Sequence, residues 1–141
     1  MIETLTIEQA LALHEEAIAA TGGSLGFLNA SHLEAALQRP LTSFGGVELF
    51  GTLYLKAAAI AHSIVTTHPF LDGNKRTAFL CAAALLYDSG QCIIADGAAI
   101  EAVIIGLIAG TVTLGDFAEW LEANSVPEQT DVEEPRCVAT P

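Results

Sequence analysis

A stretch of nine residues, His68-Pro-Phe-Leu-Asp-Gly-Asn-Lys-Arg76, gathers the side chains of this chain that are best suited to perform chemistry together. His68 titrates near neutral pH, so it could accept a proton from an attacking hydroxyl group. Asp72 supplies the hard oxygen atoms that Mg²⁺ prefers when it is bound jointly with substrate phosphates. We expect Phe70, between these two, to point inward and anchor the stretch in the core.

The last four residues of the stretch are suited to bind phosphate. Gly73 allows a close approach of the backbone to a ligand, Asn74 carries a side-chain amide, and Lys75 and Arg76 add two positive charges. These residues open a predicted helix, whose first N–H groups lack partners within the helix and attract anions. Each residue alone is compatible with an ordinary turn, but together they predict a phosphate site beside a base and a metal ligand. Phosphoryl-type transfer requires little more.

The charge balance makes the pair Lys75-Arg76 conspicuous. The chain of 141 residues has five Lys plus Arg against seventeen Asp plus Glu, giving a net charge of −12. A surface this acidic repels the phosphates of nucleic acids, so a direct nucleic-acid partner is not expected. Two adjacent cations at a helix start are unfavourable for the helix dipole, which argues for an anionic ligand there.

Helix signals recur along the chain, whereas strand signals do not, and this predicts a compact all-α domain of five to six helices. Capping-box patterns at Thr6 and Ser31 open two of these helices, and the very apolar third helix is expected to be buried on all sides. The predicted helices cover residues of about 6–20, 31–39, 48–66, 74–88, 96–110 and 113–123. Residues 40–47, with two glycines, are predicted to form an exposed loop or flap.

The composition predicts a single domain over residues 1–123, followed by a flexible acidic tail over 124–141 that contains three of the five prolines. Three cysteines without a CxxC spacing indicate reduced thiols. No apolar N-terminal leader is present, and the longest apolar stretches are too short for a membrane helix. We therefore expect a cytoplasmic protein with no membrane association.

The stretch His68–Arg76 is similar to the signature of the Fic/Doc superfamily, His-x-Phe-x-(Asp/Glu)-(Gly/Ala)-Asn-(Gly/Lys)-Arg. Lys75 occupies a position where the Fic branch usually has glycine, so the chain resembles the death-on-curing (Doc) branch. The resemblance extends over roughly residues 4–123. Its flanking matches are Leu13-His14-Glu15, Gly22-Gly23, Leu33-Glu34-Ala35-Ala36-Leu37 and Arg39-Pro40.

The resemblance implies a Fic-type helical fold and a toxin that transfers a phosphoryl group from ATP to a hydroxyl of a protein, elongation factor Tu in Doc-like proteins. It assigns the base to His68 and the Mg²⁺ ligand to Asp72. Phosphate contacts would come from Asn74, Lys75 and Arg76, with Gly73 supplying backbone. A Phd-like antitoxin would hold the toxin inactive.

Two alternatives remain open from the sequence. The same loop could transfer AMP to a protein hydroxyl, which is the activity associated with glycine in place of Lys75. A catalytically idle Fic-like module could instead only bind a partner. The resemblance further implies that the segment at Phe44 docks a target backbone.

The chain lacks the (Ser/Thr)-x-x-x-Glu-(Gly/Asn) pattern with which many Fic-like proteins inhibit themselves. Thr4–Glu8 and Thr130–Glu134 have the spacing, but Gln9 and Pro135 follow them. We therefore expect inhibition by a separately encoded antitoxin.

Overall fold

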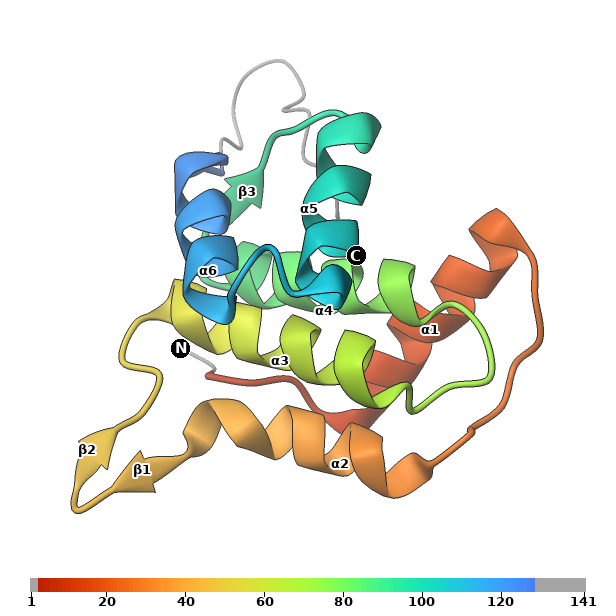
Figure 1. Cartoon of the computed structure of the whole chain (residues 1–141), viewed down its shortest axis with the longest axis horizontal. Helices are drawn as coiled ribbons and strands as arrows, with labels where there is room; N and C mark the ends of the chain where they lie inside the picture. Colours follow the sequence, from red (N-terminus) through yellow and green to blue (C-terminus); the bar gives the residue numbers. More distant parts are fainter. Residues whose placement is uncertain (1–2, 129–141) are drawn as a thin grey trace.

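Two apolar helices joined by the stretch His68–Gly73 form the centre of the molecule. The computed structural model describes residues 3–128. Helices α3 (Leu53–Thr67) and α4 (Asn74–Asp88) run antiparallel to each other through the middle of the fold (Figure 1). Most of their residues are buried, and several of these buried residues are alanines, which allow close helix packing. The prediction of a central helix that is apolar on all sides is confirmed.

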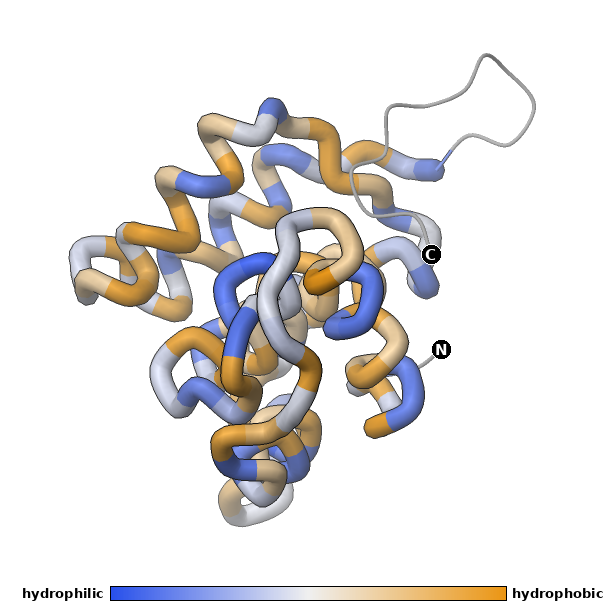
Figure 2. Tube along the Cα trace, turned by 90° about the vertical axis from the view of Figure 1, so that its right-hand side faces the viewer, coloured by the Kyte–Doolittle hydropathy of each residue, from blue (hydrophilic) through white to orange (hydrophobic). Residues whose placement is uncertain are grey.

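Four further helices surround this pair. They are α1 (Ile7–Thr21), α2 (Ala30–Gln38), α5 (Gly97–Ala109) and α6 (Leu114–Ala123). In the view of Figure 1, α2 lies below α3, and α5 and α6 lie on the opposite side of the central pair. Helices α1, α2 and α6 carry both hydrophilic and hydrophobic residues, as expected for helices that cover a core with one face, whereas α5 is almost entirely apolar. Figure 2 colours the whole trace by hydropathy. The predicted all-α class is confirmed.

Two predicted helix starts are wrong, and both errors concern the capping residue. Thr6 caps α1 through a capping box with Gln9, as predicted. At α2, however, the cap is Asn29, whose Oδ1 accepts from the backbone N–H of Ser31, so the helix begins at Ala30. The third helix begins only at Leu53, because Thr52 caps it.

The predicted flap is a small β-hairpin rather than an irregular loop. Strand β1 (Ser43–Phe44) pairs antiparallel with β2 (Val47–Glu48) after a short 3-10 turn over Arg39–Leu41. Gly45 and Gly46 both have positive φ, 59° and 82°, which is the backbone that a tight two-residue hairpin turn requires. The hairpin therefore closes on itself and precedes the N-terminal end of α3.

A second ribbon lies just after the predicted domain boundary at residue 123. Strand β3 (Gln91–Ile93) pairs antiparallel with β4 (Ser125–Pro127), and the N–H of Ile94 donates to the carbonyl of Asn124 at 2.8 Å. The expected flexible tail thus begins with a paired strand, because β3 offers it a backbone edge. Residues 129–141, the rest of that predicted tail, lie outside the described residues.

The cysteines differ from the expectation of reduced thiols. Cys81 is a free thiol in the middle of α4, and burial raises its pKa to about 12. Cys92 in β3 is disulfide-bonded, so the expectation is wrong for that residue. Among the described residues, no helix combines the length and the apolar character needed to cross a membrane.

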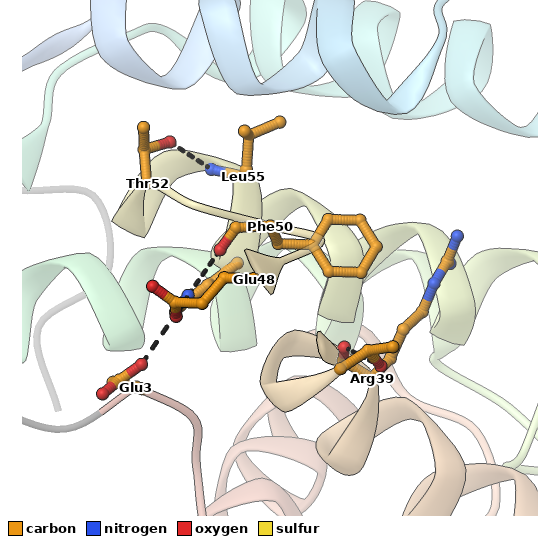
Figure 3. A network of polar contacts seen from close by, with 8 residues as sticks. Glu3, Arg39, Glu48, Phe50, Thr52 and Leu55 are labelled. Carbon is orange, nitrogen blue, oxygen red and sulfur yellow. Dashed lines mark hydrogen bonds and ion pairs between the residues drawn. The ribbon is translucent and has the colours of Figure 1, made fainter. Parts of the chain in front are cut away.

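A buried lysine ties the hairpin to the helical core. The side chain of Lys56 on α3 is 5% exposed, and its Nζ donates to Glu48 Oε1 at 2.6 Å and to the carbonyl of Phe50. Glu3 Oε1 lies 3.6 Å from the same nitrogen. Figure 3 labels three of these partners, Glu3, Glu48 and Phe50, which come from the N-terminal segment and from the hairpin and the residues after it. Lys56 therefore fixes the N-terminal segment, the hairpin and the start of α3 against one another.

We predict that Lys56→Met destabilises the protein by about 1–3 kcal/mol, since it leaves the buried carbonyl of Phe50 without its donor. The matched control is Glu3→Gln, which removes only the longer and more exposed pair and should cost no more than about 1 kcal/mol. Chemical denaturation measures both. Equal losses in the two variants would contradict the central role of Lys56.

The same network predicts a pH dependence. The hydrogen bond from Lys56, together with its charge, holds the pKa of Glu48 below its ordinary value. The unfolded chain therefore binds the proton more readily, and stability from this pair is present above the ordinary glutamate pKa of about 4.3 and is lost as the pH falls below it. Lys56→Met should remove this part of the acid sensitivity.

Candidate active site

His68 ends helix α3 with an unusual backbone. Its φ of 51° makes it the one non-glycine residue with positive φ among residues 3–128, and its N–H still bonds the carbonyl of Ile64 at 3.0 Å. A left-handed residue ends the helix abruptly and turns the chain sharply. Pro69 follows and is buried, whereas the imidazole of His68 is exposed and lines a cleft. The sharp turn thus presents the predicted base to that cleft.

Phe70 anchors the loop, as the sequence predicted. It is 1% exposed, and its ring stacks on the ring of His14 with centroids 3.7 Å apart and an angle of 7° between the planes. The ring of Phe27 lies on it at 5.5 Å, and the backbones of Phe27 and Phe70 form an isolated antiparallel bridge. The loop is therefore held between α1 and the connection from α1 to α2.

The side chain of Asn74 closes the loop from the other end. Its Oδ1 accepts from the N–H of Phe70 at 3.1 Å, and its Nδ2 donates to the carbonyl of Phe70 at 2.9 Å. The amide that was predicted to contact phosphate is thus buried, and it bonds the backbone of Phe70 within the loop. What Asn74 offers a ligand is its backbone N–H, at the first position of α4.

The N-terminus of α4 is open. The five other α-helices of the described region have an Asn, Asp or Thr side chain bonded to a backbone N–H of their first turn. Helix α4 instead starts at Gly73, which has a φ of 80° and provides no side-chain cap. A Cβ at Gly73 would lie 3.0 Å from Ile18 Cδ1, so glycine also permits the close packing of α1. The first N–H groups of α4 are left for a ligand.

Lys75 and Arg76 stand at this open end. Both are exposed, and neither forms an ion pair or a hydrogen bond through its side chain with any residue in the range 3–128. They line a cleft of about 890 Å³ together with His68, Asp72 and Gly73. Helix dipole, free N–H groups and two unpaired cations therefore act at the same place, which makes it attractive to an anion.

The other cations of the described region have internal partners. Lys56 is bound in the network of Figure 3. Arg39 donates to His62 Nδ1 at 3.0 Å and to Ser63 Oγ at 2.9 Å, and its guanidinium lies beside the ring of Phe50. Burial, and secondarily the charge of Arg39, hold the pKa of His62 below its ordinary value. The positive charge available to a ligand is thus concentrated at the cleft.

The carboxylate of Asp72 is exposed at the cleft and bonded on one side. Its Oδ2 accepts the N–H of Ser24 at 2.8 Å. The described residues contain no group of three or more His, Cys, Asp or Glu side chains that could hold a metal alone. One carboxylate beside a phosphate site fits Mg²⁺, which is commonly bound through one or two carboxylates together with substrate phosphates.

The relationship of this chain to known proteins follows from a match to a protein-family model. The model of the Fic/DOC family matches residues 4–86, a range that includes the whole stretch His68–Arg76. The chain belongs to the Fic/DOC family. Proteins of this family generally bind nucleotides.

A curated relative agrees with this assignment. The chain is 39% identical over 77 residues to a protein of Mycolicibacterium smegmatis named "Toxin Doc". The match covers 55% of this chain and 59% of the relative, so it spans less than two thirds of that protein.

In this Fic/DOC chain, the second wall of the cleft comes from α5, which lies outside the matched range 4–86. The α5 side chains that line the cleft are Ile100, Glu101, Ile104 and Ile108. The sequence did not reveal their role, because α5 is apolar on nearly every side and no pattern distinguishes its cleft face. The capping residue Asp96 indicates in the sequence where α5 begins, but it does not indicate which face of the helix lines the cleft.

Phe44 is not brought to the cleft. It is 86% exposed on the hairpin before α3, whereas His68 follows the last turn of that helix (Figure 1). A helix of 15 residues separates the two ends by about 20 Å at 1.5 Å per residue. The docking of a target by Phe44 stays a prediction, and the self-paired hairpin that carries Phe44 lies at the far end of α3 from His68.

We predict that Asn74→Ala destabilises the protein by about 1–3 kcal/mol, since it leaves the buried N–H and carbonyl of Phe70 without partners. The matched control is Asn124→Ala, because Asn124 also donates to the carbonyl four residues earlier, on Trp120, at 2.9 Å. Denaturation measures stability, and amide exchange at Phe70 reports the loop. Faster exchange at Phe70 is expected only in Asn74→Ala; unchanged exchange there would refute the clamp.

Proposed function

We propose that this protein is a Doc-like toxin that transfers the γ-phosphoryl group of ATP to a hydroxyl of a protein. The observation that carries the proposal is the uncapped N-terminus of α4, where Lys75 and Arg76 lie unpaired in one cleft with His68 and Asp72. Family membership and the resemblance to a protein named as a Doc toxin support it. The proposed target is a translation factor, elongation factor Tu, and its modification would arrest growth.

In the proposed phosphoryl transfer, the residues that line the cleft have separate roles. The N–H groups at the start of α4, with Lys75 and Arg76, bind the phosphates and offset their charge. His68 accepts the proton of the target hydroxyl while the hydroxyl oxygen forms a bond to the γ-phosphorus. The bond between the γ-phosphorus and the oxygen that bridges it to the β-phosphate breaks, and ADP leaves. Asp72 would hold Mg²⁺, which supplies further charge neutralisation at the phosphates.

The apolar residues of α5 complete the nucleotide site in this proposal. Ile100 and Ile104 line the same cleft as the phosphate-binding end and give it an apolar surface. Such a surface suits the flat face of a nucleobase, which loses contact with water when it packs there. The phosphates and the base would thus be bound by different elements, the start of α4 and α5.

Lys75 favours phosphoryl over AMP transfer. A glycine at this position leaves room for a further phosphate near the helix start, whereas a lysine fills that room and supplies a point charge. A different phosphate is then presented to the nucleophile. Transfer of AMP and the idle binding module remain the outcomes against which the proposal is tested.

We predict that incubation with γ-labelled ATP and a cell extract labels a protein, and that α-labelled ATP does not. The variant His68→Ala should lower the labelling rate by about 10²–10⁴-fold, since it removes the base without touching the core. Its melting temperature serves as the control for folding. Label from the α position would instead establish AMP transfer, and label from neither would favour the idle module.

We predict that Arg76→Ala weakens ATP binding about 10-fold or more, since a hydrogen bond to a charged group contributes about 1.5–3 kcal/mol. Arg76→Lys keeps the charge without the planar guanidinium, so an intermediate affinity is expected. Calorimetry with ATP and Mg²⁺ provides the measurement. Affinities that agree across wild type and both variants would remove Arg76 from the site.

Inhibition by a separate protein is part of the proposal. Glu8 lies in the first turn of α1, where Thr6 forms a capping box, and Glu134 lies outside the described residues. Within the described region, no carboxylate lies within ion-pair distance of Arg76. A Phd-like antitoxin would then provide the restraint, docking a helix with an apolar face.

A further inference from the structure

Asp72 is held in place from outside its own loop. Its backbone carbonyl accepts a hydrogen bond from His14 Nε2 at 2.8 Å, and its Oδ2 accepts one from the N–H of Ser24, also at 2.8 Å. His14 belongs to α1, and Ser24 belongs to the connection from α1 to α2. Both the main chain and the side chain of Asp72 are thus oriented by the N-terminal part of the molecule.

Gly23 makes the second of these contacts possible. Its φ of 114° lies in the region that favours glycine, and a Cβ built on it would approach Asp72 Cβ to 3.0 Å and Oδ2 to 3.3 Å. Gly22, its neighbour, also has a positive φ, 84°, but a Cβ there would meet nothing within 4 Å. A residue with a Cβ would be strained at either position, but only at Gly23 would that Cβ meet Asp72.

His14 is suited to its contact because it is locked in position. Only 3% of the surface of His14 is exposed, and its ring lies flat on that of Phe70. The carbonyl of Asp72 can only accept, so Nε2 carries the proton. A fixed ring with a defined donor holds the carbonyl of Asp72 at a fixed place relative to α1.

We propose that His14, Gly23 and the N–H of Ser24 are positioning elements that hold the Asp72 carboxylate in one orientation for Mg²⁺. The inference rests on the proposed function in its assignment of Asp72 as the metal ligand. The bond from Ser24 engages Oδ2, and no described residue bonds Oδ1, so the carboxylate is fixed while one oxygen stays available. Partners of this kind around a metal ligand typically contribute about 10–100-fold to metal affinity or activity.

The test compares Gly23→Ala with Gly22→Ala. We expect Gly23→Ala to raise the Mg²⁺ concentration for half-maximal labelling by about 10–100-fold. Gly22→Ala introduces similar backbone strain without displacing Asp72, so its Mg²⁺ requirement should stay within about twofold of wild type. Equal shifts in the two variants would overturn the proposal, because strain alone would then explain them.

A second measurement uses the metal-free protein and needs no activity. In Gly23→Ala the N–H of Ser24 should exchange with solvent faster than in wild type, since its bond to Asp72 is displaced, and in Gly22→Ala it should not. If wild type transfers no label but Ser24 responds as stated, the proposed function fails and the positioning contact stands. If wild type is active and Gly23→Ala matches it in both measurements, the positioning role fails alone.

Two variants of His14 test the other contact. His14→Phe keeps an aromatic ring on Phe70 and removes the donor, whereas His14→Gln places an amide N–H near the position of Nε2. We expect His14→Phe to raise the Mg²⁺ requirement and His14→Gln to restore part of it, with similar melting temperatures. If His14→Phe is folded and has the Mg²⁺ requirement of wild type, His14 is excluded from the proposal.

Discussion

The reciprocal pair of hydrogen bonds between Asn74 and Phe70 is the constraint on which the site depends. The pair closes a loop of a few residues between two antiparallel helices, and it fixes where α4 begins relative to the end of α3. The buried ring of Phe70 then fastens the closed loop to α1. With both in place, His68 and Asp72 stand at defined positions on the rim of the cleft, although both are exposed.

The few cations of the described region fall into two groups, one that stabilises the fold and one that faces the cleft. Arg39 and Lys56 are enclosed by partners and serve architecture, since each joins α3 to segments that precede it. Lys75 and Arg76 have no such partners within the described residues and serve the cleft. In a chain with a net charge of −12, an anion meets repulsion over much of the surface and attraction at the open end of α4.

The sequence predicted those features that depend on local patterns. Helices α1 and α4 were located closely, because a capping box opens one and a Gly-Asn start opens the other. The start of α2 was misplaced, since Ser31 matched a capping pattern, whereas the structure shows that Asn29 caps the helix by accepting from the N–H of Ser31. Strand β4 was missed because three residues acquire their conformation from pairing with β3.

The sequence predicted which residues belong to the site, but it did not predict the contacts that these residues make with one another and with the rest of the fold. The nine-residue motif indicates which groups could act, but only the three-dimensional structure shows that the side chain of Asn74 bonds the backbone of Phe70. His14 is a buried histidine whose hydrogen-bond partner, the carbonyl of Asp72, lies 58 residues away in the chain. Long-range contacts of this kind leave no local pattern.

The two walls of the cleft differ in their chemistry and in their relation to the family model. The wall that carries the motif lies within the segment matched by the family model, whereas α5 lies beyond it. The cations and the open N–H groups of the cleft come from the start of α4, whereas α5 contributes mainly isoleucine side chains. Substitutions at Ile100 or Ile104 therefore change the shape and apolar character of the cleft without removing a group that attracts an anion.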